Sequence, residues 1–205
     1  MNNAPAEATV APSTTRQGRG IGKILLEIVL ISAGVFLGLA GEQWRQGAEE
    51  RAMGREALRR FRSEIATNRA AVESVRAYHA DMRTRIKAYL AADATARKSL
   101  TVELKGIQPV TFEHTAWDLA LATQSLTYID RGLAFDLSRI YSSQDDYAGL
   151  SRSVLQAMYL RPPTEDLDAF FRVVALYYDD VVLDEPRLIE MYDAVLPRID
   201  KMLGE

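Results

Sequence analysis

Histidine and paired aspartates are the residue types in this chain that most readily do chemistry. His79 and His114 stand 35 positions apart and do not form the HExxH spacing of a zinc site. A metal or general-base site at either histidine would therefore need carboxylates that the fold brings to it. The adjacent acids are Asp145-Asp146 and Asp179-Asp180. Because neighbours on a helix point about 100° apart, these pairs are predicted to be solvated faces or caps and not acid–base dyads.

The other residue types and motifs that could support catalysis also indicate a non-enzymatic protein. There is no cysteine, which excludes disulfides, thiolate metal sites and cysteine nucleophiles. No nucleophile elbow, kinase motif set or dinucleotide loop is present. We therefore expect no catalytic residues, no cofactor and no metal. Four aromatic residues are predicted to lie in the core, with lining of a small-molecule pocket as the alternative: Trp117, Tyr141, Tyr177 and Tyr178.

Charge is distributed unevenly along the 205 residues. The net charge of −3 does not suggest binding to nucleic acid. Residues 43–99 hold 13 Lys and Arg against 7 Asp and Glu, whereas residues 162–205 hold 4 against 11. Such regions can attract each other within one bundle or attract separate partners, and the intramolecular interpretation is favoured.

An apolar segment, Ile24–Ala40, is the strongest signal in the sequence. Its 17 residues carry one charge, Glu27, and a helix of that length spans roughly 26 Å. We therefore predict a transmembrane helix over residues 21–41, with Trp44 as an interfacial anchor and the lipid bilayer as a partner. Glu27 is interpreted as interfacial, with a functional intramembrane acid as the alternative.

Two other interpretations of this segment are a buried core helix and a cleaved signal peptide. A core helix rarely has so uniform an apolar circumference. Gly38 and Ala40 satisfy the small-residue rule of a cleavage site, but the preceding region is long and a helical pattern continues from Gly41, which favours retention.

The orientation of the span rests on flanking charge. Three basic residues precede the span and three follow it within a similar distance: Arg16, Arg19 and Lys23, then Arg45, Arg51 and Arg55. The short tail before a first apolar segment favours a cytoplasmic N-terminus, with the C-terminal domain in the periplasm of a bacterial inner membrane.

Small residues within the span suggest self-association. Gly34 and Gly38 form a GxxxG pair, and they share one helix face with Glu27. Small residues let two helices approach closely, so a homodimer through this face is a hypothesis.

The soluble part is predicted to be all-α. Residues 1–20 are predicted to be a disordered tail, residues 42–95 a long heptad-patterned helix continuous with the span, and residues 96–205 a helical bundle packed on it. The heptad seam of this helix consists of Leu58, Phe61, Ile65, Asn68, Val72, Val75, His79, Met82, Ile86 and Tyr89. Packing within the chain is favoured over a coiled coil between copies. Asn68 and His79, as polar seam residues, are predicted to fix the register of the helix.

Start and stop signals divide the C-terminal part. A connection is expected over residues 98–109, with a short extended piece at residues 101–104. Thr115 is predicted to cap a helix over residues 116–123, and Asp130 a helix ending near Leu160. Thr164-Glu165 and Asp184 are predicted to begin two further helices, and Pro197 to kink or shorten the last.

Two stretches carry a resemblance to a known family: GEQWRQGAEER after the apolar span, and TAWDLALATQSLTYIDRGLAFDLSRIYSSQDDY later in the chain. Together with a Glu-bearing span they resemble bacterial membrane-anchored proteins grouped as a domain of unknown function (DUF6090-like). Gln43 departs from the Asn-rich form of the motif before the tryptophan. The resemblance implies membrane anchorage and helical content but no activity. The corresponding positions are Glu27, Trp44, Trp117, Leu137 and Tyr141.

These observations favour a membrane-anchored, non-enzymatic helical module that acts through protein–protein contacts, with an envelope protein or a second copy as partner. The alternative is a ligand-binding sensory or carrier domain with a small-molecule pocket between helices.

Overall fold

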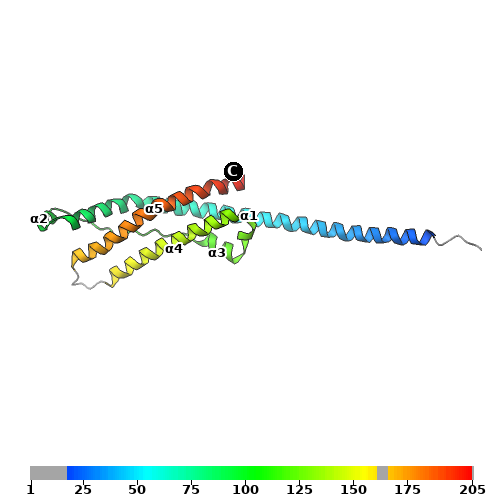
Figure 1. Cartoon of the computed structure of the whole chain (residues 1–205), viewed down its shortest axis with the longest axis horizontal. Helices are drawn as coiled ribbons and strands as arrows, with labels where there is room; N and C mark the ends of the chain where they lie inside the picture. Colours follow the sequence, from blue (N-terminus) through cyan, green and yellow to red (C-terminus); the bar gives the residue numbers. More distant parts are fainter. Residues whose placement is uncertain (1–17, 161–165, 205) are drawn as a thin grey trace, which may run out of the picture. The chain divides into compact units, whose positions relative to one another are not determined.

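The computed structural model describes residues 18–160 and 166–204 of this chain, and all regular structure in that part is helical. The predicted all-α class is therefore confirmed. The elements are α1 (Gly18–Ala91), α2 (Ala94–Arg97), α3 (Thr115–Ala122), the 3-10 helix η1 (Ser125–Tyr128), α4 (Arg131–Tyr159) and α5 (Leu167–Leu203) (Figure 1). The chain divides into two compact units, residues 1–49 and 50–205.

The first unit contains the apolar N-terminal part of α1. This part is long and apolar enough to cross a membrane, and none of its most apolar window is buried. The large side chains from Ile24 to Leu39 are each more than half exposed. Residues 1–17 of the predicted tail lie outside the described residues, whereas Gly18–Gly20 already belong to α1.

The second unit is a bundle in which α4 and α5 pack side by side against the second part of α1 (Figure 1). The heptad seam faces its core: of its ten residues only Val75 and Tyr89 are partly exposed. The seam thus packs within the chain because α4 and α5 supply the apolar surface that it needs. The long helix ends at Ala91 and not at residue 95, and Asp93 then caps α2 by accepting from the amides of Thr95 and Ala96.

Opposite charges on α1 and α5 join the two helices in antiparallel register. Three ion pairs recur at heptad intervals on both: Arg62–Asp200, Arg69–Asp193 and Arg83–Asp179. The remaining heptad position lies between Arg69 and Arg83, where the register places Arg76 opposite Pro186. Arg76 instead pairs with Glu73 on its own helix. The uneven charge distribution is therefore explained within the bundle.

Helix boundaries in the C-terminal part follow the sequence signals in one case and depart from them in others. Asp130 caps α4 through a bond from the amide of Leu133, as predicted. The predicted helix start at Asp184 is wrong, because α5 runs unbroken through Pro186 and Pro197. Both prolines lie on the exposed side, so neither ring displaces a core contact. The predicted start at Thr164-Glu165 lies outside the described residues.

Candidate functional site

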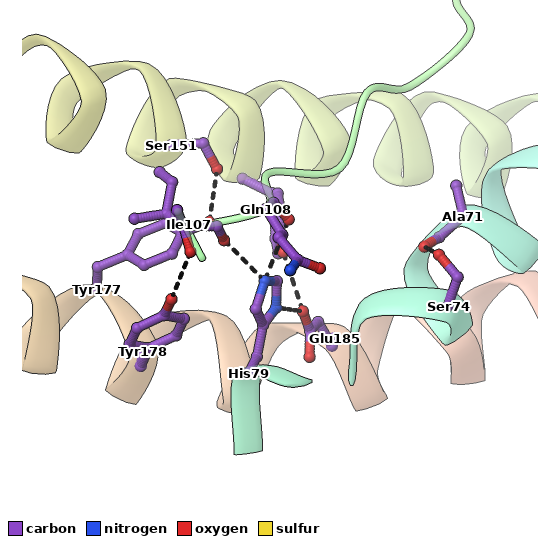
Figure 2. A network of polar contacts seen from close by, with 11 residues as sticks. Ala71, Ser74, His79, Ile107, Gln108, Ser151, Tyr177, Tyr178 and Glu185 are labelled. Atoms are coloured by element: carbon purple, nitrogen blue, oxygen red, sulfur yellow. Dashed lines mark hydrogen bonds and ion pairs between the residues drawn. The ribbon is translucent and has the colours of Figure 1, made fainter. Parts of the chain in front are cut away.

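A buried polar network centred on His79 ties α1, α4, α5 and the segment before α3 together (Figure 2). His79 Nδ1 lies 2.5 Å from Glu185 Oε1, and its Nε2 lies 2.9 Å from the carbonyl of Ile107 and 3.1 Å from that of Gln108. Because Nε2 faces only the carbonyl oxygens of Ile107 and Gln108, it donates to them, and Nδ1 makes the contact with the Glu185 carboxyl group. The histidine therefore meets a carboxylate, as a catalytic role would need.

Two tyrosines and a serine extend this network along α4 and α5. Tyr147 donates to Glu185 Oε1 at 3.0 Å, and the hydroxyls of Ser151 and Tyr177 lie 3.2 Å apart. Burial raises the pKa of Tyr147, with the nearby charge of Glu185 adding to it, and burial also raises the pKa of Tyr177. Both hydroxyls consequently stay protonated, so Tyr147 is available as a donor at all physiological pH values.

The segment before α3 is held to this network by its carbonyls. The hydroxyls of Tyr78 and Tyr178 both donate to the Gly106 carbonyl, at 2.6 and 3.3 Å. Gly106 and Gln108 have φ values of 80° and 46°, and these two left-handed residues turn the chain so that Ile107 is inserted in the core. The carbonyls of Gly106, Ile107 and Gln108 therefore all accept hydrogen bonds from side chains of α1 or α5.

A second buried carboxylate caps α3. Glu64 of α1 accepts from the amide of Ala116 at 2.7 Å and from the hydroxyl of Tyr141 at 2.6 Å. The cap residue expected from sequence, Thr115, is already the first residue of the helix, and His114 before it makes no side-chain cap bond. Glu64 replaces a local cap because its carboxyl oxygen lies at the helix N-terminus, where the amides need an acceptor.

The other polar seam residue, Asn68, clamps the main chain of Glu113. Its Nδ2 donates to the Glu113 carbonyl at 2.9 Å, and its Oδ1 accepts from the Glu113 amide at 2.8 Å. Asn68 and His79 therefore contact the same connecting segment, although they do not contact each other.

The buried network is a structural element of the bundle and not an open reaction centre. The side chain of His79 is fully buried and that of Glu185 is 2% exposed, so no substrate reaches them without opening the core. His114 instead lies near the surface, 3.5 Å from Asp145 through Nε2. Among the described residues no group of three or more acidic or histidine side chains is placed to hold a metal ion.

Three of the four aromatic residues considered as pocket lining lie in the core, and Trp117 is partly buried against it. Trp117 stacks on Tyr141 with ring centroids 4.9 Å apart. Tyr177 and Tyr178 are 1% and 0% exposed and contact the His79 ring edge to face or tilted. The prediction of a core position is confirmed for Tyr141, Tyr177 and Tyr178, but the sequence did not identify Glu64, Tyr147 and Glu185 as buried polar residues.

Two surface hollows of the bundle are candidates for binding. One is an apolar groove of about 330 Å³ between α1 and α3, with alanines on its floor and Glu56 and Arg60 in its lining. The other is a cleft of about 310 Å³ between α4 and residues 109–114, with Ser151 and Arg152 in its lining. Ser151 connects this second cleft to the buried network through Tyr177.

The residues predicted to act in the membrane all lie in the first unit. A side chain added at Gly34 or Gly38 would meet no atom of the chain within 4 Å, and Trp44 is 80% exposed. Glu27 is likewise exposed. These positions are thus free to face lipid or another helix.

Comparison of the chain with family models, with curated proteins and with solved structures yields no match. The resemblance to the DUF6090-like family therefore stays a prediction, and the site is interpreted from its own geometry.

Proposed function

We propose that this chain is a single-pass membrane protein whose helical bundle acts through contacts with another protein. The observation that carries the proposal is the apolar part of α1, whose large side chains are more than half exposed over residues 24–39. Leaving that surface in water would cost about 25 cal/mol for each Å² of apolar area, and a bilayer removes the cost. The bundle itself is closed around its own core, which supports a role for its surface.

The proposed topology has the N-terminus in the cytoplasm and residues 50–205 in the periplasm of a bacterial inner membrane. Partners are then an envelope protein of unknown identity and, through the face of Glu27, Gly34 and Gly38, a second copy of the chain. No nucleic acid is expected as a partner, since the net charge is −3.

Protease treatment of intact spheroplasts tests the anchor and the topology together. The C-terminally tagged chain is followed by immunoblot of the membrane fraction before and after addition of external protease. We expect a full-length, membrane-bound band that the protease removes. A band protected until the membrane is lysed would reverse the topology, and a shortened band released into the soluble fraction would show that the apolar segment is cleaved.

A further inference from the structure

Residues 110–114 alternate as a β-strand does, although they belong to no sheet in the described part of the chain. Every second side chain, at Val110, Phe112 and His114, is buried or half-buried, whereas Thr111 and Glu113 are exposed. This two-residue alternation is typical of a half-buried strand. Within the described ranges, however, no residue is assigned to a strand, so this segment pairs with none.

Part of this segment has main-chain groups without partners among the described residues. Glu113 is held by both its amide and its carbonyl through Asn68, as one residue of a neighbouring strand would hold it. Val110, Thr111 and Phe112 make no main-chain hydrogen bond to any described residue. Exposed main-chain donors and acceptors in an extended segment form a template for a further strand.

The cleft of about 310 Å³ lies directly beside these groups. Its walls come from residues 109–114 and from α4, and Ala148 and Leu155 supply apolar surface. Arg152 also lines it, and no acidic side chain in the described part of the chain pairs with this guanidinium. By contrast, Asp145 at the same cleft already has His114 as its neighbour. The cleft thus offers one cation, Arg152, that has no counter-charge among the described residues.

We propose that this cleft binds an extended peptide of a partner protein, which adds as a strand to Val110–Phe112 and places an acidic side chain on Arg152. A bound helix cannot satisfy the main-chain groups, because its own amides and carbonyls are already paired. An extended peptide satisfies them at the spacing of a strand, and its alternate side chains reach the cleft. The proposal rests on the proposed function, since it assigns the surface through which the bundle meets its partner.

A phage-displayed library of random dodecapeptides, selected on the full chain in lipid nanodiscs, tests the proposal. We expect the selected peptides to share an acidic residue within a stretch of β-forming residues. For a fluorescent synthetic copy of one such peptide, Arg152→Glu should weaken binding at least tenfold, and Arg152→Gln by less. Replacing the peptide's acid by lysine should restore binding to the Arg152→Glu chain.

Arg139 provides the matched control, because it is an exposed arginine of the same helix that lines a different hollow and has no acidic partner in the described residues. Arg139→Glu should leave the affinity unchanged. Amide hydrogen exchange on the wild-type chain should slow at Val110–Phe112 when the peptide binds.

Selection of no common peptide, equal binding by the Arg152→Glu chain, or protection confined to other segments would overturn the strand proposal. These outcomes differ from the outcome expected if the proposed membrane anchor is wrong. In that case the chain would be released from the membrane but would still select acidic peptides.

Discussion

At the scale of single residues, the bundle depends on buried polar side chains that bond to other elements; among the described side chains, Gln144 Oε1 is buried without a partner. His79 and Glu185 are the extreme case, since both are buried and they lie 106 positions apart in the chain. A buried pair is costly to break because the remaining member stays in the core without its partner, whereas an apolar pair of similar size avoids desolvation altogether.

We predict that His79→Leu destabilises the bundle by about 3–5 kcal/mol, and that the double variant His79→Leu/Glu185→Leu recovers most of this loss. The measurement is guanidinium unfolding of the full chain in detergent, followed by Trp117 fluorescence in a Trp44→Phe background. If the double variant were as unstable as the sum of its single variants, the two side chains would not act as a pair.

The close approach of Gly54 to the main chain of Tyr128 leads to a second prediction at this scale. A Cβ added to Gly54 would lie 2.5 Å from the carbonyl oxygen of Tyr128, which is main chain and cannot rotate away. Gly54→Ala should therefore destabilise the bundle by about 1–3 kcal/mol in the same unfolding assay. Gly149→Ala is the control, because its nearest neighbour is 4.0 Å away at the end of the Arg152 side chain. It should be neutral or stabilising by about 0.5–1 kcal/mol.

At the scale of elements, oppositely charged residues at heptad spacing fix the antiparallel register of α1 and α5. Arg62, Arg69 and Arg83 each meet an aspartate of α5, and the series lacks a partner only where Pro186 lies opposite Arg76. Pro186 lowers the stability of the bundle in two ways: it removes a main-chain hydrogen-bond donor from α5, and it offers Arg76 no carboxylate.

Pro186→Ala is predicted to raise the melting temperature of the bundle, since proline within a helix is about 3 kcal/mol less favourable than alanine. Pro186→Glu should raise it slightly further by supplying Arg76 with a counter-charge, a gain of about 0.2–1 kcal/mol for an exposed pair. Circular dichroism on heating reports both. An equal melting temperature for the two variants at low salt would show that the heptad register does not bring these positions together.

The same ion pairs make the bundle sensitive to acid. Burial alone would raise the pKa of Asp179, but hydrogen bonds from Lys87 and Arg83 outweigh it and lower the pKa below 3.8. The hydrogen bond from Arg69 likewise lowers the pKa of Asp193. A carboxyl with a lowered pKa in the folded state binds protons better when unfolded. Its contribution is therefore complete above about pH 4 and is lost as the pH falls through the lowered value.

We expect the unfolding midpoint in guanidinium to fall between pH 5 and pH 2. The double variant Asp179→Asn/Asp193→Asn should have a lower unfolding midpoint at pH 5, and its midpoint should fall less steeply between pH 5 and pH 2. Asp180→Asn, a mutation of an exposed acid on α5 that pairs with no described basic residue, is the control and should keep the slope of the wild-type chain.

The elements predictable from sequence are those whose signals are local. The heptad repeat of α1 and the Asp130 cap are each indicated by residues that are neighbours along the chain, and both predictions are confirmed. The start predicted at Asp184 failed because tertiary packing of α5 overrides the local preference of proline. The capping of α3 by Glu64 could not be predicted, because the two are 52 positions apart and only the fold joins them.

At the scale of the whole molecule, the chain places a closed bundle after an apolar helix that has no cover of its own. The bundle buries its own apolar core, so apolar association is expected where the apolar helix is left uncovered. Glu27, Ile31, Gly34 and Gly38 recur at spacings of four and three, which places them on one face of the helix. Val29 points away from that face.

This arrangement predicts that two copies meet along the Gly34 face in the membrane. The chain contains no cysteine, so single cysteines report contact without background. Under copper-phenanthroline oxidation of membrane vesicles, Ile31→Cys should form a disulfide-linked dimer, and Val29→Cys should not. Adding Gly34→Ile and Gly38→Ile to the Ile31→Cys chain should abolish the cross-link, because large side chains hold the backbones apart. Equal cross-linking at both cysteines would indicate random collision, and the dimer interpretation would then be wrong while the anchor stands.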